Sequence, residues 1–116
     1  MKRILVIDDD ADLRESLRMV LQMEGFEVFE AADGAHGVEL AQTIQPDLIT
    51  CDMKMPGYDG SQVMEILSSS PETAHVPIVF ISAGDDTVAG TAYTHYRFVQ
   101  KPFDVLKLIS TIKQYV

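Results

Sequence analysis

An apolar run followed at once by carboxylates decides the fold of this chain: residues 4–10 read Ile4-Leu5-Val6-Ile7-Asp8-Asp9-Asp10. Four consecutive apolar residues, mostly β-branched, predict a strand that is covered on both of its faces. Strands of this kind are typical of parallel sheets that carry helices on each side. The acidic residues then mark the carboxyl end of the strand.

The same pattern repeats along the chain. Apolar runs predict further strands over residues 26–31, 47–51 and 78–81, and a fifth that begins at Phe98 and Val99. Apolar residues at helical spacing predict a helix between the first strand and Gly25, and others over residues 35–44, 59–69 and 104–115. Strands that alternate with helices predict an α/β fold in one domain, residues 1–116. The expected architecture is three-layer, flavodoxin-like and doubly wound, with a five-stranded parallel sheet in the order 2-1-3-4-5.

Two local expectations accompany this fold. Asp33-Gly34 predicts a turn, and Pro46 marks the end of the second helix. The segment 84–96 is rich in glycine and threonine, which are poor helix formers, so the fourth helix is expected to be short or irregular.

Composition restricts the function. The 116 residues hold 18 Asp and Glu against 9 Lys and Arg, a net charge of −9, which disfavours direct contact with nucleic acid or an anionic membrane. The single Cys51 excludes an intramolecular disulfide and is typical of a reducing compartment. No apolar run approaches the ~18 residues of a membrane span, and the N-terminus does not resemble a signal peptide. A cytoplasmic protein is expected.

Polar residues follow three of the predicted strands directly: Asp8-Asp9-Asp10, Asp52 and Ser82. Open parallel sheets bind ligands at the carboxyl ends of their strands, so Asp8, Asp9 and Asp52 are expected to converge. Two carboxylates at ~4 Å repel by about 4 kcal/mol at an effective dielectric constant of 20, and a cation would relieve that cost. A site with oxygen ligands alone favours Mg²⁺.

A carboxylate beside Mg²⁺ is a plausible nucleophile for a phosphoryl group. A second cation and a hydroxyl would then be needed near the new phosphoryl oxygens, and Lys101 and Ser82 are placed to supply them. The sequence therefore indicates phosphoryl transfer onto an aspartate.

The chain resembles the response-regulator receiver domains of two-component signalling, of the chemotaxis-regulator type, over essentially its whole length. The resemblance is carried by residues 4–14, by residues 46–60 (PDLITCDMKMPGYDG), by residues 77–83 (PIVFISA) and by residues 98–103 (FVQKPF). Each motif alone is a weak signal, but four of them at successive strand ends are specific.

The resemblance implies a role for each site residue. Asp52 would be the phosphoacceptor, supplied by a phosphohistidine of a partner kinase. Mg²⁺ would be held by Asp9, Asp52 and the main-chain carbonyl of Lys54, with Asp8 acting mainly through water. Ser82 would supply the hydroxyl that moves toward the phosphoryl group, and Lys101 would pair with it. Phe98 would occupy the aromatic switch position.

The implied partners are a sensor histidine kinase or phosphotransfer protein, and a downstream effector protein or a missing C-terminal output domain. The expected state is a monomer or a phosphorylation-dependent dimer, with no enzymatic activity beyond the domain's own phosphorylation and dephosphorylation. One alternative is a receiver-like interaction module with impaired switching, because the stretch from Ser82 to Phe98 is shorter than usual and Thr94-His95 replaces the usual Gly-Ala pair. A second is a Mg²⁺-dependent phosphohydrolase with an aspartyl nucleophile, although such enzymes have a second acid where this chain has Lys54.

Some residues near the site have simpler interpretations. Asp10 is better explained as a helix N-cap than as a metal ligand. Cys51 is better explained as a small buried apolar residue than as a nucleophile. The side chain of Lys54 is expected to point to solvent.

Overall fold

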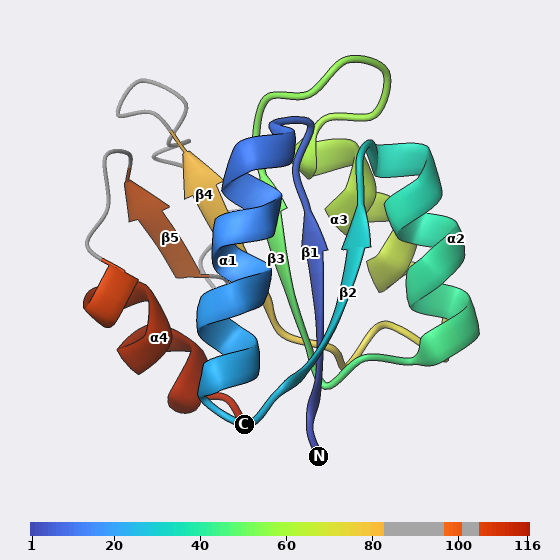
Figure 1. Ribbon diagram of the computed structural model, residues 1–116. Helices are drawn as coiled ribbons and strands as arrows, with labels where there is room; N and C mark the ends of the chain where they lie inside the picture. Colours follow the sequence, from blue (N-terminus) through green and yellow to red (C-terminus); the bar gives the residue numbers. More distant parts are fainter. Residues whose placement is uncertain (83–96, 101–104) are drawn as a thin grey trace.

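The computed structural model describes residues 1–82, 97–100 and 105–116; for Ser82, residues 97–100 and Val105 it describes the main chain alone. Strands and helices alternate through most of this chain (Figure 1). In chain order they are β1 (Arg3–Ile7), α1 (Ala11–Met23), β2 (Glu27–Ala31), α2 (Gly34–Ile44), β3 (Leu48–Asp52), α3 (Gly60–Ser68), β4 (Ile78–Ser82), β5 (Arg97–Gln100) and α4 (Val105–Lys113). The segment expected to hold a short or irregular helix lies outside the described residues.

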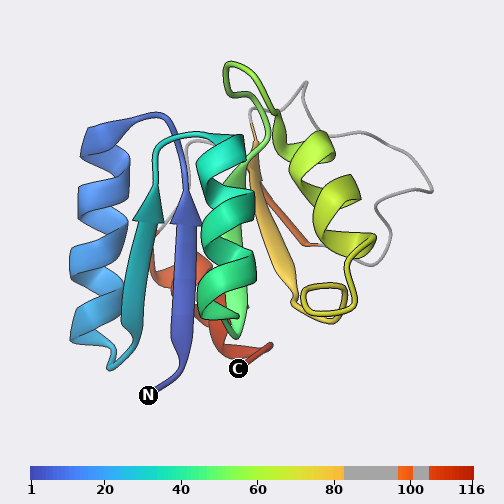
Figure 2. The same cartoon turned by 90° about the vertical axis from the view of Figure 1, so that its right-hand side faces the viewer.

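The five strands form one parallel sheet in the order β2-β1-β3-β4-β5. Helices α1 and α4 cover one face of the sheet, and α2 and α3 cover the other (Figures 1 and 2). This confirms the doubly wound, flavodoxin-like architecture. The strand order reverses between β1 and β3, so the carboxyl ends of these two neighbours form the topological switch point where open sheets bind ligands.

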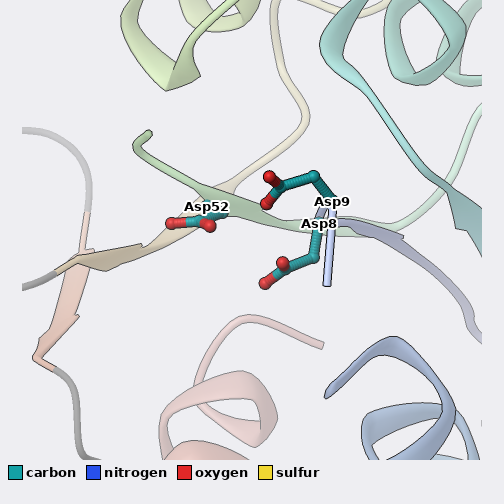
Figure 3. Close-up of side chains that lie close together, drawn as sticks. All are labelled: Asp8, Asp9 and Asp52. Carbon is teal, nitrogen blue, oxygen red and sulfur yellow. The ribbon is translucent and has the colours of Figure 1, made fainter. Parts of the chain in front are cut away.

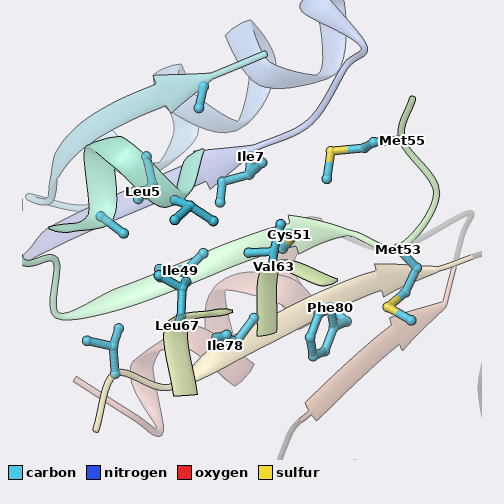
Figure 4. Close-up of a cluster of buried hydrophobic side chains, with 14 residues drawn as sticks. Leu5, Ile7, Ile49, Cys51, Met53, Met55, Val63, Leu67, Ile78 and Phe80 are labelled. Atoms are coloured by element: carbon cyan, nitrogen blue, oxygen red, sulfur yellow. The ribbon is translucent and has the colours of Figure 1, made fainter. Parts of the chain in front are cut away.

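Alternate residues of the strands feed two apolar cores. The core under α2 and α3 contains Leu5, Ile7, Ile49 and Phe80, and Figure 4 shows it between the sheet and α3. The core under α1 and α4 contains strand residues such as Ile4, together with apolar side chains of those two helices. Because both faces of the sheet are covered, β1 and β3 are apolar almost throughout, which is the pattern that the sequence shows.

Capping residues set several helix ends. The side chain of Asp10 accepts hydrogen bonds from the amides of Asp12 and Leu13, at 3.0 and 3.2 Å, which confirms Asp10 as the N-cap of α1. After α1 the chain reverses at Gly25, whose φ of 94° favours glycine.

The start of α2 differs from the sequence-based expectation. Asp33 is the N-cap of α2, since its side chain accepts the amide of His36 at 2.7 Å, and Gly34 is the first residue of the helix and not part of a free turn. Helix α2 ends at Ile44 as expected, and its C-cap is Gln45, which precedes Pro46 and lies in the left-handed region with φ of 49°.

Helix α2 packs closely against β1 at Gly37. A Cβ at Gly37 would lie 2.5 Å from Cδ1 of Ile7 and 2.8 Å from its Cγ1. Only glycine leaves room for Ile7 at this distance. The position of Ile7 is therefore fixed from one side, and Ile7 is the residue that precedes the first acidic residue of the candidate site.

Candidate functional site

Asp8 and Asp52 reach the same edge of the sheet because of the strand register. Ile7 of β1 is paired with Cys51 of β3, so the next residue of each strand is an aspartate. The amide of Asp8 donates to the carbonyl of Ala31 at 3.1 Å and continues the ladder of β1 with β2. Asp52 was expected just after its strand; it is instead the last residue of β3, paired with Ile81. Both aspartates are thus held by backbone pairing.

Three carboxylates converge at this edge. Asp8, Asp9 and Asp52 each place one carboxylate oxygen within 4.8 Å of the others, as expected from the sequence (Figure 3). Asp8 is 1% exposed and Asp52 is 6% exposed, whereas Asp9 is exposed. Carboxylates at this separation repel each other by roughly 3 kcal/mol at an effective dielectric constant of 20. The cluster has oxygen donors, two buried carboxyl groups and one exposed member, which fits a hard divalent cation that keeps some of its water.

The turn after β1 holds Asp8 and Asp9 in place. Oδ1 of Asp8 accepts the amide of Asp10 at 2.9 Å, so the side chain of Asp8 closes the turn that presents Asp9. The next carboxylate, Asp10, is used as the cap of α1. The three consecutive aspartates therefore differ in their contacts: Asp8 closes the turn, Asp9 supplies the exposed carboxylate of the cluster, and Asp10 caps the helix.

The loop after β3 contains Lys54, whose main-chain carbonyl is the remaining expected metal ligand. Residues 53–59 fold back so that the amide of Gly60 donates to the carbonyl of Met53 at 2.8 Å. A Cβ at Gly60 would lie 2.9 Å from Cα of Met53 and 3.0 Å from the carbonyl oxygen of Asp52, so this return needs glycine. The side chain of Lys54 is exposed, as expected. Lys54, Met55, Pro56 and Asp59 line an open hollow of about 410 Å³ on this loop.

Asp59 ends the loop with a capping box. Its Oδ1 accepts the amide of Gln62 at 3.0 Å, and its own amide donates to Oε1 of Gln62 at 2.9 Å. The pKa of Asp59 is lowered, chiefly because its carboxylate accepts the hydroxyl of Ser61 at 2.6 Å and also because it accepts the amides of Gln62 and Ser61; partial burial opposes this. The first turn of α3 therefore stabilises the carboxylate form of Asp59.

A pH dependence follows from the lowered pKa of Asp59. Its contribution to stability is complete above the unfolded-state pKa of about 4 and is lost as the pH falls through the lower folded-state value. The variant Asp59→Asn keeps the cap but does not titrate. From about pH 5 downward, the free energy of unfolding of the wild type should fall more steeply than that of the variant, by up to about 1 kcal/mol. Urea titrations at several pH values measure this, and parallel curves for the two proteins would contradict it.

Cys51 lies beside Asp52 in sequence but does not act as a nucleophile. Its side chain is fully buried in the core under α2 and α3. Burial raises the pKa of the thiol, and the nearby carboxylates of Asp52, Asp8 and Asp59 raise it further. The thiol stays protonated at neutral pH, which confirms its interpretation as a small apolar residue.

For the other predicted site residues, Ser82, Phe98 and Lys101, the structure describes the main chain alone or nothing. Ser82 is the last residue of β4 and is paired with Gln100, so its main chain lies at the same edge of the sheet as the acidic cluster. Phe98 is in β5, paired with Phe80. Lys101 lies outside the described residues. The roles of the side chains of Ser82, Lys101 and Phe98 remain predictions.

Arg14 lies in the first sequence motif, residues 4–14, but no role for it is evident from the sequence. In the structure, Nη1 of Arg14 donates to the main-chain carbonyl of Asp8 at 2.7 Å. The signal was the spacing: an arginine in the first turns of the helix that follows Asp8 can reach back to the turn. Its second contact, with Glu30 in β2, has no signature in the local sequence.

The protein-family model described as response regulator receiver domain matches residues 4–113 of this chain. The chain belongs to this family. Receiver domains are the phosphoacceptor domains of two-component systems and are not classical enzymes. The resemblance inferred from the four strand-end motifs is therefore confirmed.

Curated relatives agree with the receiver assignment. The DNA-binding dual master transcriptional regulator RpaA of Synechocystis sp. is 34% identical over 116 residues, which are 97% of this chain and 48% of that protein. The transcriptional regulatory protein PrrA of Mycobacterium bovis is 38% identical over 114 residues, which are 96% of this chain and 48% of that protein. The receiver chain thus spans about half the length of these relatives.

Solved structures share the receiver fold. The chemotaxis response regulator CheY4 of Vibrio cholerae superposes with a TM-score of 0.90 at 26% identity, over 100% of this chain and 99% of that one. Within the described part of this receiver, no helix is long and apolar enough to cross a bilayer.

Proposed function

We propose that Asp52 is the phosphoacceptor of this receiver domain and that the acidic cluster binds Mg²⁺. The observation that supports this most directly is the convergence of Asp8, Asp9 and Asp52 at the switch point of the sheet. Asp9, Asp52 and the main-chain carbonyl of Lys54 would hold the ion, and Asp8 would act mainly through water. Bound Mg²⁺ would offset the negative charge of the cluster and of the incoming phosphoryl group.

In the proposed reaction a carboxylate oxygen of Asp52 attacks the phosphorus of a phosphohistidine on a sensor histidine kinase or phosphotransfer protein. An O–P bond forms, the P–N bond breaks, and the imidazole leaves with the electron pair. The domain promotes its own phosphorylation and dephosphorylation and turns over no other substrate. Backbone pairing holds Asp52 before the reaction, so little reorganisation is required of the acceptor.

Ser82 and Lys101 are proposed to contact the transferred phosphoryl group, and Phe98 to respond to it as the switch residue. Ser82 is the last residue of β4, the strand next to β3, which supports its part in this set. Phosphorylation would favour one of two arrangements of these residues and so change the contacts of the domain with an effector protein or an output domain. We propose a cytoplasmic domain comprising residues 1–116, monomeric or dimerising on phosphorylation.

The proposal predicts phosphorylation that depends on Mg²⁺. Incubation with acetyl phosphate and Mg²⁺ should add one phosphoryl group to the intact protein, and an excess of chelator should prevent the addition. The product should be labile to hydroxylamine, as an acyl phosphate is and a serine ester is not. Intact-mass spectrometry measures both.

Three other outcomes would contradict the proposal. Binding of Mg²⁺ with no gain of mass would favour a receiver-like interaction module with impaired switching. Continued release of phosphate from phosphomonoesters would favour the phosphohydrolase. A hydroxylamine-stable product would place the phosphoryl group on a residue other than an aspartate.

A further inference from the structure

Arg14 connects the acidic turn to the neighbouring strand. Its Nη1 donates to the carbonyl oxygen of Asp8 at 2.7 Å, and its Nε lies 3.5 Å from Oε1 of Glu30 in β2. The side chain of Arg14 is 18% exposed, so most of it is buried. From this we infer that Arg14 is a positioning residue that fixes the directions of the Asp8 and Asp9 carboxylates, and that Glu30 holds Arg14 in place.

The planarity of the peptide bond explains how one carbonyl contact can direct two side chains. The carbonyl of Asp8 belongs to the rigid group of atoms that runs from Cα of Asp8 to Cα of Asp9. A guanidinium that holds this oxygen therefore fixes the plane between the two Cα atoms. The Asp8 carboxylate is held from the other direction by the amide of Asp10, so the whole turn is fixed at two points.

Glu30 is the anchor of this arrangement. Its Oε2 lies 3.0 Å from Nε of Arg18, and its other oxygen faces Arg14, so one carboxylate holds two arginines one helical turn apart on α1. Arg18 also lies 4.0 Å from Glu15, on the exposed side. Among these residues Arg14 alone contacts the acidic turn. Arg18 is therefore a matched control, because it shares Glu30 with Arg14 but does not contact Asp8.

The inference rests on the proposed Mg²⁺ site and adds residues that act on it indirectly. Groups that orient metal ligands typically change metal affinity by roughly 10–100-fold when they are removed. Charge alone predicts the opposite sign for Arg14, because loss of a positive charge near the cluster should tighten the binding of a cation. The direction of the change therefore separates positioning from simple electrostatics.

The first experiment is calorimetric titration of Mg²⁺ into the wild type, Arg14→Gln, Arg14→Lys, Glu30→Gln and Arg18→Gln. Arg14→Gln should weaken binding by about tenfold or more. Arg14→Lys should recover part of that loss, because an ammonium can still donate to the Asp8 carbonyl. Glu30→Gln should also weaken binding, and Arg18→Gln should change it by less than about threefold.

The second experiment needs no metal. Amide hydrogen exchange at Asp10, measured by NMR in metal-free protein, should be faster in Arg14→Gln and Glu30→Gln than in the wild type and unchanged in Arg18→Gln. Unchanged exchange, or tighter Mg²⁺ binding by Arg14→Gln, would overturn the inference while leaving the metal site standing. Absence of Mg²⁺ binding by the wild type would instead overturn the site itself and the inference with it. The exchange measurement also remains valid if a variant is less stable, since each is compared at a temperature where it is folded.

Discussion

Replacing Asp52 with asparagine is expected to abolish phosphorylation by acetyl phosphate and, in the same protein without metal, to raise the melting temperature. The amide lacks the nucleophilic charge, so no acyl phosphate forms. The second effect follows from the cluster, where Asp52 is 6% exposed and has an oxygen within 4.8 Å of oxygens of Asp8 and Asp9. Asparagine has nearly the same shape and removes one of the three converging carboxyl groups.

The size of the stability change can be bounded. The repulsion in the cluster is roughly 3 kcal/mol per pair at an effective dielectric constant of 20, and solvent at Asp9 reduces it. A net gain of about 1–2 kcal/mol is expected, which corresponds to a rise of roughly 4 °C or more. Thermal unfolding followed by circular dichroism, with and without Mg²⁺, measures it, and the ion should stabilise the wild type more than the variant.

Asp59→Asn is the control for both effects. It removes a carboxylate from the same loop region and keeps its N-cap, but Asp59 is not one of the three converging residues. It should accept a phosphoryl group like the wild type, and its melting temperature at neutral pH should not rise. Phosphorylation of Asp52→Asn at the wild-type level would assign the acceptor to another residue.

The stabilising effect expected of Asp52→Asn means that the site is maintained at a cost to the fold. Carboxylates that converge at one edge of the sheet repel one another, and the protein holds them by backbone pairing in the centre of the sheet. The surrounding apolar cores on both faces supply the stability that allows this. We therefore expect a receiver of this kind to gain stability when it binds the proposed cation.

The acidic cluster could be predicted from the sequence because the strand ends that carry it are marked by local sequence patterns. An apolar run that ends in a carboxylate identifies both the strand and its end, and the alternation with helices makes the strands parallel. Asp8, Asp9 and Asp52 then had to meet, whatever their side-chain conformations. Asp10 could be separated from them because capping depends on its immediate neighbours.

Other features depend on tertiary contacts and had no local signal. The pairing of Arg14 with Glu30 joins α1 to β2, and no spacing in the sequence specifies it. The close approach of α2 to β1 at Gly37 depends on the packing of Ile7. The boundary at Asp33 was missed because Asp-Gly is a common turn pair, and only the structure shows that the aspartate accepts the amide of His36.

Asp9→Asn is expected to weaken Mg²⁺ binding by at least tenfold, whereas Asp10→Asn should change it by less than about threefold. Both variants remove one negative charge from adjacent, exposed positions, and asparagine preserves the N-cap at residue 10. Only Asp9 has an oxygen among the converging three. Even in bulk water a divalent cation gains about 2 kcal/mol from one negative charge at ~4 Å, which exceeds the roughly 1.4 kcal/mol of a tenfold change.

The comparison of these neighbours separates coordination from general electrostatic attraction. If the ion were held only by the acidic surface of the chain, loss of either charge would have the same small effect, and high salt would remove binding to the wild type. If the oxygen of Asp9 is a ligand, the two variants differ by calorimetric titration and the difference persists at high salt. Equal affinities for Asp9→Asn and Asp10→Asn would show that Asp8 and Asp52 hold the ion without Asp9, and the buried pair alone would then define the metal site.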